Sequence, residues 1–246
     1  MTGLLVACVV AAWPCPAAKD VKLVCTEKEP KGCVPSAEAL LTSPGCREEA
    51  LSRYRVACHV KEARACAKLG FRLVEASRDA KTVKEAIALF EKACAGNDAM
   101  GCANLATFFW DGEGVPRDVR KAGALFQQAC DAGDAFACGS LGAMYAQGEL
   151  GAKDLPKAAA LFKKACDGGS ASGCNQLGNA TVAASLEGAM TLWAKACKGG
   201  YAAACTNLGR AFRKQKDDRN AEKAFARACK LGDSEGCGER DVPPEE

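Results

Sequence analysis

The nine residues Cys130-Asp131-Ala132-Gly133-Asp134-Ala135-Phe136-Ala137-Cys138 contain the pattern that predicts the fold. An amphipathic segment ends at the first cysteine, with Ala122, Leu125, Phe126 and Ala129 at helical spacing. Glycine then offers the left-handed backbone that commonly ends a helix, and the aspartate after it is a preferred N-cap. The nine residues therefore predict a helix, a tight turn and an antiparallel second helix.

The same cysteine spacing occurs six times, with first members 36, 36, 36, 31 and 32 residues apart. A period of this size indicates helical hairpins stacked into a solenoid, so we expect an all-α fold. Lys61 breaks the turn pattern in the earliest unit, and Tyr201 breaks the N-cap pattern in a later one. One aromatic residue lies four residues before each first cysteine, where helical spacing predicts a place in the core: Tyr54, Phe90, Phe126, Phe162, Trp193 and Phe225.

Seventeen cysteines, a single histidine and the absence of any C-x-x-C sequence favour disulfides over metal sites. A tight helical corner brings its two cysteines within disulfide range. We therefore expect an exported protein with the pairs Cys58–Cys66, Cys94–Cys102, Cys130–Cys138, Cys166–Cys174, Cys197–Cys205 and Cys229–Cys237. Metal binding or redox chemistry at these cysteines is the alternative.

The first eighteen residues are similar to a signal peptide or lipoprotein leader, although they lack a basic start. Leu5-Val6-Ala7-Cys8 resembles a bacterial lipobox and makes Cys8 the lipidation candidate; cleavage near Ala17-Ala18 is the alternative, and no export is a third. A lipidated Cys8 leaves sixteen cysteines, with Cys25–Cys33 and Cys15–Cys46 as possible further pairs. Pro30, Gly32 and Pro35 do not predict helix around Cys25 and Cys33. We expect a capping segment over residues 19–47 and a disordered acidic tail over 241–246.

Residues 133–142, Gly-Asp-Ala-Phe-Ala-Cys-Gly-Ser-Leu-Gly, followed by Tyr145 and Gly148, resemble a Sel-1-like repeat. So do Gly112-Glu113-Gly114-Val115, Asp118 and Lys121-Ala122. The similarity extends over residues 48–240, and the paired cysteines resemble those of a cysteine-rich, secreted bacterial subgroup. This resemblance implies a right-handed solenoid with a concave groove and an adaptor function; some members of the subgroup are described as penicillin-binding proteins or weak β-lactamases. Residues 180–186 lack the glycine-rich loop, so we expect a shortened hairpin there.

A polar residue stands ten positions after five of the first cysteines, between apolar or small neighbours: Lys68, Asn104, Ser140, Gln176 and Asn207. In the similar tetratricopeptide repeats this helix lines the groove, and the asparagine equivalent to Asn104 and Asn207 binds a peptide backbone or carboxylate. Amides suit this role because they both donate and accept hydrogen bonds. The alternative is that these residues are solvated or bonded within the repeat.

Composition and motifs exclude several other functions. The formal net charge of +3 is spread along the chain without a basic cluster, which argues against nucleic-acid binding. The chain has no hydrolase motif; His59 has no evident catalytic partner, and Asp111, Glu113 and Asp118 lack the spacing of a calcium loop. We therefore expect no cofactor or metal.

The function expected from the sequence is that of a monomeric scaffold that binds a protein, a peptide or a cell-wall fragment. It would be secreted, or held at the periplasmic or outer membrane of a bacterium only through a lipid anchor. A penicillin-binding protein or weak β-lactamase is one alternative, and a structural envelope protein is another.

Overall fold

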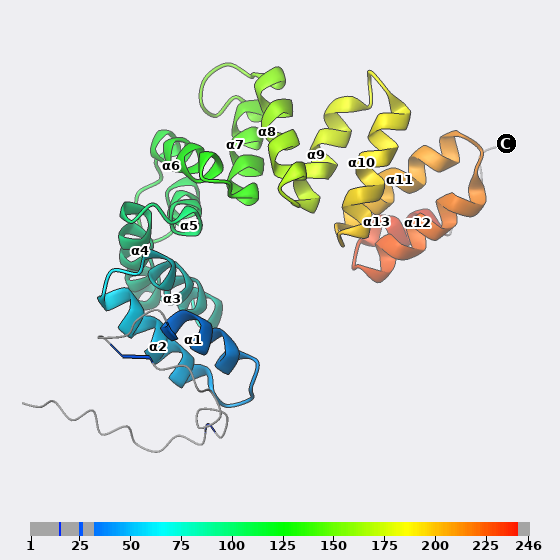
Figure 1. Ribbon diagram of the computed structural model, residues 1–246. Helices are drawn as coiled ribbons and strands as arrows, with labels where there is room; N and C mark the ends of the chain where they lie inside the picture. The colour runs from blue at the N-terminus through cyan, green and yellow to red at the C-terminus, as the bar shows by residue number, and fades with distance from the viewer. Residues whose placement is uncertain (1–14, 16–24, 27–31, 241–246) are drawn as a thin grey trace, which may run out of the picture. The chain divides into compact units, whose positions relative to one another are not determined.

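The computed structural model describes residue 15, residues 25–26 and residues 32–240. This part of the chain contains thirteen α-helices and no strand, which confirms the all-α prediction (Figure 1). Cys8, most of the expected leader and the acidic tail 241–246 lie outside the described residues. The expected capping segment contributes α1, which begins at Cys33 and contains Pro35. The prediction of non-helical surroundings for Cys33 was therefore wrong, because proline is tolerated in the first turn of a helix.

Two compact units divide the chain between Gly101 and Cys102, within α5. The helices of the first unit are α1 (Cys33–Leu41), α2 (Arg47–His59), α3 (Ala63–Ala76) and α4 (Ala80–Ala95), followed by α5 (Ala99–Asp111). The second unit contains α6 (Val119–Asp131), α7 (Ala135–Gln147), α8 (Leu155–Asp167), α9 (Ala171–Thr181), α10 (Leu186–Lys198), α11 (Ala202–Lys214), α12 (Asp218–Lys230) and α13 (Ser234–Arg240).

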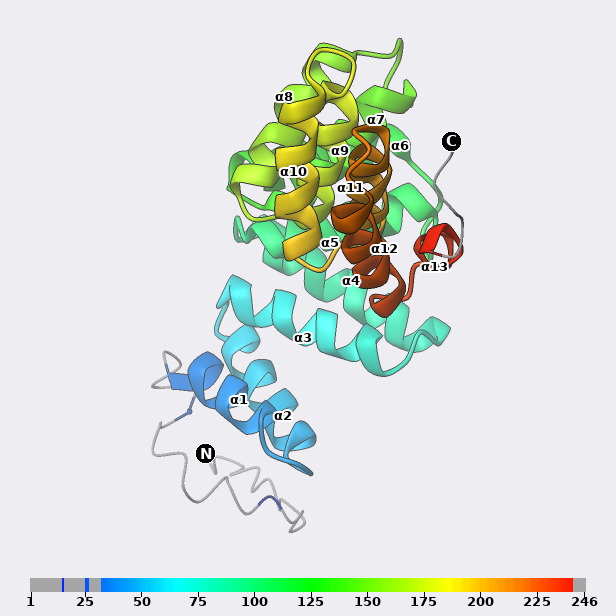
Figure 2. The same ribbon diagram turned by 90° about the vertical axis from the view of Figure 1, so that its right-hand side faces the viewer.

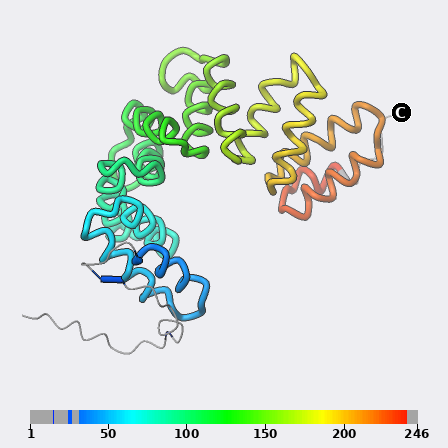
Figure 3. The backbone as a smooth tube through the Cα atoms, viewed as in Figure 1, coloured from blue at the N-terminus to red at the C-terminus, as the bar shows by residue number. Residues whose placement is uncertain are grey.

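Helices of the second unit pack in chain order, each against the one before and the one after it (Figure 3). Helix α7 also contacts α9, and α11 also contacts α13. We call α7, α9, α11 and α13 the odd layer, and α6, α8, α10 and α12 the even layer. Helix α9 is the shortest complete member of the odd layer, since it ends at Thr181 and only four residues lead to α10.

Each repeat buries one aromatic side chain beneath a glycine of the helix before it. Phe90, Phe162, Trp193 and Phe225 are at most 6% exposed, so the predicted core position of the aromatic ladder is confirmed there. A Cβ atom added at the facing glycine would lie 2.9 Å or less from the ring; the facing glycines are Gly70, Gly142, Gly178 and Gly209. The sequence pairing of a small residue with an aromatic thus allows close helix packing around a thin core.

The turns at the cysteine pairs share one backbone conformation. Asn97, Gly133, Gly169, Gly200 and Gly232 all have positive φ, as their residue types predict. Asp134 and Ser170 cap the following helices by accepting hydrogen bonds from Ala137 N and Gly173 N, at 2.7 Å and 3.1 Å. Tyr201 has no side-chain cap, as expected.

Lys61 was expected to break the turn, yet its φ of 66° is the same left-handed conformation. The corner between α2 and α3 therefore forms without glycine, because packing and the disulfide impose it. A non-glycine residue pays for this backbone with about 1 kcal/mol.

The C-terminal end of the repeat array is held by charge. Arg210 contacts Glu235 at 2.5 Å and Glu239 at 2.8 Å, and Arg213 contacts Glu239 at 2.6 Å. Hydrogen bonds from Arg210, opposed by burial and assisted by Arg213, hold the pKa of Glu239 below its ordinary value near 4.5. These ion pairs join α11 to α13 (Figure 2).

Replacing Lys61 by glycine should stabilise the protein by about 1 kcal/mol, because glycine adopts the left-handed backbone without strain. Chemical denaturation of the oxidised protein measures this change. Gly133→Lys is the matched control: no atom lies within 4 Å of the added Cβ, so only the backbone cost should appear, as a loss of similar size. A stability loss in Lys61→Gly would contradict the account.

Acid should weaken the attachment of α13. Because the pKa of Glu239 is lowered in the folded state, its contribution is present above pH 4.5 and is lost as the pH falls through the folded-state pKa. The stability difference between the wild type and Glu239→Gln should therefore shrink between pH 5 and pH 3, in thermal unfolding at matched ionic strength. A difference that stays constant over this range would show that the ion pairs do not stabilise the end of the array.

Candidate binding surface

Disulfides close the corners between consecutive helices. The structure joins Cys58 to Cys66, Cys130 to Cys138, Cys166 to Cys174, Cys197 to Cys205 and Cys229 to Cys237, with Cα–Cα distances of 4.4–4.8 Å. Cys94 and Cys102 are disulfide-bonded as well. Cys15 is bonded to Cys46 and Cys25 to Cys33, the two further pairs that the sequence allows. These covalent links fix where each odd-layer helix begins relative to the even-layer helix before it.

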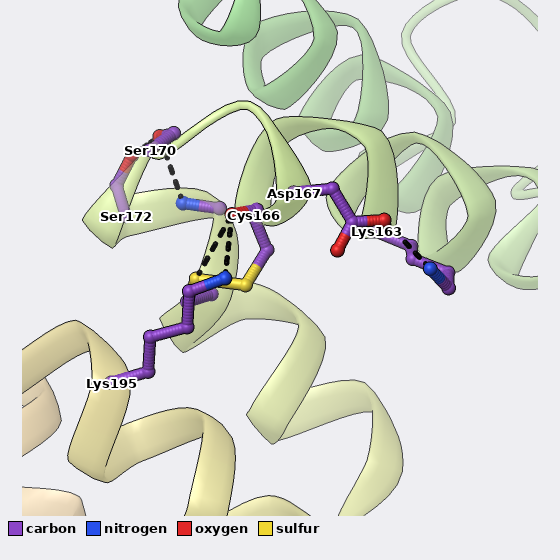
Figure 4. The surroundings of a disulfide bond; sticks show 8 residues. Lys163, Cys166, Asp167, Ser170, Ser172 and Lys195 are labelled. Atoms are coloured by element: carbon purple, nitrogen blue, oxygen red, sulfur yellow. Dashed lines mark hydrogen bonds and ion pairs between the residues drawn. A yellow bond between two sulfur atoms is a disulfide. The ribbon is translucent and has the colours of Figure 1, made fainter.

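Cations of the even layer strengthen the same corners. Lys195 of α10 donates to the carbonyl oxygen of Cys166 at 3.0 Å, beside the Cys166–Cys174 bond (Figure 4). Arg227 of α12 donates to the carbonyl oxygen of Cys197 at 3.2 Å. Carbonyl groups in the last turn of a helix lack partners within that helix, so a cation there is doubly favourable. The even layer thereby holds consecutive repeats in register.

The five polar residues predicted to line a binding surface occupy different environments. Lys68 of α3 forms an ion pair with Glu38 of α1, within the first unit. Asn104 is half-buried in α5. Ser140 of α7 is only 9% exposed, which leaves its hydroxyl little room to meet a ligand. Gln176 of α9 and Asn207 of α11 are both half-buried and belong to one hydrogen-bonded cluster.

This amide cluster consists of Asn175, Gln176 and Asn179 on α9 and Asn207 on α11. The Asn207 amide nitrogen donates to Asn175 Oδ1 at 3.0 Å and to Asn179 Oδ1 at 3.2 Å. Weaker contacts of 3.5 Å and 3.4 Å run from the Asn175 and Asn179 nitrogens to Gln176 Oε1. The cluster therefore bridges two neighbouring helices of the odd layer with neutral groups.

Trp193 holds the cluster in place from the even layer. Its indole Nε1 donates to Asn179 Oδ1 at 3.0 Å, while its ring packs against Gly178. A buried indole N–H normally finds a partner of this kind. Asn179 thus accepts from both Trp193 and Asn207, and its orientation is set by two separate repeats.

Sequence reasoning missed Asn175 and Asn179. The residue equivalent to Asn175 is alanine or glycine in three other repeats, at Ala67, Ala103 and Gly139. Asn175 is only 4% exposed, and a buried amide is costly unless it is hydrogen-bonded. The replacement of a small residue by asparagine at an otherwise small position was the signal that could have identified this repeat.

Arg210 and Arg213 continue the surface along α11 beyond Asn207. Both guanidinium groups are engaged by Glu239, and hydrogen bonding to Glu235, the largest effect, raises the pKa of Arg210. The odd layer therefore changes from neutral amides to paired charges toward its C-terminal end.

The described residues contain no group of three or more His, Cys, Asp or Glu side chains that could hold a metal ion. None of the helices in this part of the chain combines the length and apolar character needed to cross a bilayer.

Solved structures with a similar fold include two repeat proteins. A Sel1 repeat protein from Oxalobacter formigenes has a TM-score of 0.73 and 23% sequence identity, over 82% of this chain and 87% of the other. The protective antigen c5321 of uropathogenic Escherichia coli has a TM-score of 0.69 and 22% identity, over 89% of this chain and 48% of its own. At these identities the likeness concerns the fold. A search of curated proteins found no match.

A model of the Sel1 repeat matches residues 63–98, 99–134, 135–170 and 202–233. Each match begins with α3, α5, α7 or α11, so every disulfide corner joins the end of one repeat to the start of the next. Residues 171–201, which form α9 and α10 and supply most of the amide cluster, are not matched. Together the matches cover more than half of the chain, which therefore belongs to the Sel1 repeat family, whose members typically mediate protein–protein interactions.

Proposed function

We propose that this protein is an exported scaffold that binds a protein partner through the amide cluster of α9 and α11. The observation that carries the proposal is the bridging of two repeats by Asn175, Asn179 and Asn207. The partner would present an extended segment whose main chain pairs with these amides.

The cluster has unused hydrogen-bonding capacity. In the described part of the chain, Asn207 Oδ1 accepts no hydrogen bond and Gln176 Nε2 donates none. One acceptor and one donor, both half-buried, match the N–H and C=O groups that alternate along a peptide. The neutrality of the cluster favours a main chain over a charged side chain as its ligand.

The cysteines support the exported location. All the cysteines of the described residues are in disulfides, a state that persists in extracellular or periplasmic compartments. Lipidation of Cys8 stays part of the proposal, as the means by which the scaffold would be held at a membrane. No contact in the described part of the chain favours the β-lactamase or the purely structural alternative.

Site-specific cross-linking tests the proposal in the host. A photoreactive residue at Asn179, which is exposed on α9, should capture one partner protein, identified by mass spectrometry. The same photoreactive residue at Lys163, which is exposed on α8 of the even layer, should not capture it. Equal capture at both positions, or capture at Lys163 alone, would contradict the proposed surface.

The affinity for the captured partner should then depend on the unused amide groups. The double variant Gln176→Ala and Asn207→Ala should weaken binding roughly tenfold or more, as expected for the loss of one or two hydrogen bonds with buried partners. Gln127→Ala on α6 is the matched control, because it removes an amide that bonds only Asp131. Unchanged affinity in the double variant, with thermal stability confirming its fold, would rule out this role for the cluster.

A further inference from the structure

We propose that α13 is a displaceable latch, and that the surface of α11 beneath it binds an acidic helical segment of a partner protein. The surface consists of Arg210 and Arg213, which now hold two carboxylates of α13. This inference goes beyond the amide cluster, and its test uses none of the cluster residues.

The contacts of α13 show what the surface recognises. Arg210 bonds both Glu235 and Glu239, which lie four residues apart on one helix. Arg213 donates from Nη1 to the Glu239 carboxylate and from Nη2 to the Glu239 carbonyl oxygen, both at 2.6 Å. Two guanidinium groups that converge on carboxylates one helical turn apart define the ligand as an acidic helix.

The arginines are positioned by parts of the fold other than α13. The guanidinium carbon of Arg213 lies 4.7 Å from the centroid of the Phe225 ring in α12. Phe225 is fully buried, and its ring packs against Gly209 of α11. Stacking on an immobile aromatic ring keeps a guanidinium group oriented. The binding surface should therefore persist when α13 moves away.

Helix α13 is attached weakly for a helix of the odd layer. Of residues 234–239, only Gly236 is buried, so apolar burial contributes little. Its start is anchored by the Cys229–Cys237 disulfide and by Thr206, whose hydroxyl donates to Asp233 at 2.6 Å. Beyond Cys237 the described attachment consists of the Glu239 contacts. This last part can leave α11 without breaking a covalent bond.

Gly238 makes the latch weaker still. Glycine lowers helix stability by about 1 kcal/mol relative to alanine. No atom lies within 4 Å of the position that a Cβ of residue 238 would take, so packing does not require glycine there. Gly236 differs, because its Cβ would lie 2.5 Å from that of Ala228. The helix therefore carries one destabilising glycine with no steric cause, which suits a segment that opens.

Peptide binding to the full, oxidised protein tests the inference. The probe is a fluorescent peptide, blocked at both ends, with two glutamates four residues apart in an uncharged, alanine-rich sequence; the control peptide has glutamines instead. The variant Glu235→Gln with Glu239→Gln frees the arginines and should bind the probe at least tenfold more tightly than the wild type at low salt. Fluorescence anisotropy measures this change, and the glutamine peptide should bind neither protein.

Two further variants keep the test decisive. Gly238→Ala, which favours the closed helix, should slow hydrogen exchange in α13 and weaken probe binding relative to the wild type. Adding Arg210→Gln and Arg213→Gln to the glutamate variant should abolish binding. Equal affinity of the wild type and the glutamate variant would overturn the proposal, as would binding that survives loss of both arginines or hydrogen exchange that Gly238→Ala leaves unchanged.

Discussion

Covalent closure of the helix corners is the constraint on which the rest of this structure depends. A pair of cysteines eight positions apart joins the end of one Sel1 repeat to the start of the next. Closing such a loop stabilises the folded chain by about 2–3 kcal/mol in the chain-entropy model. The core needs this help, since aromatic residues make up only 6% of the chain and each of Phe90, Phe162, Trp193 and Phe225 fills a space left by a glycine. The disulfides thus compensate for a thin apolar layer.

A framework held in this way tolerates polar residues between its helices. Asn175 replaces the alanine or glycine of other repeats and is buried, although its hydrogen bond to Asn207 recovers only part of the desolvation cost. The repeat that contains it also has the shortened hairpin and falls outside the Sel1 matches. Departures from a local rule concentrate at functional sites. This coincidence is why the proposed binding site is placed at α9 and α11 rather than along the whole odd layer.

The corners could be predicted from the sequence because they depend on local chemistry. Gly133, Asp134 and the cysteines at either side each contribute through their own backbone or side chain, and they recur at fixed positions. Lys61 and Pro35 show the limit of such reasoning, since packing and a disulfide imposed structure that the residue types oppose. The amide cluster could not be predicted, because it depends on which residues of α9 meet Asn207 of α11. That register is set by helix packing across a repeat of unusual length.

The same limit applies to the polar residues ten positions after each first cysteine. Equal sequence positions led to an ion pair at Lys68, a buried hydroxyl at Ser140 and an amide cluster at Gln176 and Asn207. Periodicity predicts which layer a residue belongs to, whereas its partners come from the neighbouring helix.

The pairing of the cysteines is tested most directly by mass spectrometry of the protein isolated from its host without reductant. Free thiols are alkylated in denaturant before digestion with trypsin. The account predicts unmodified, disulfide-linked peptides: Cys130–Cys138 and Cys166–Cys174 each within one peptide, and Cys58–Cys66, Cys197–Cys205 and Cys229–Cys237 between two. Alkylated cysteines at these positions, or zinc retained in the intact native mass, would contradict it.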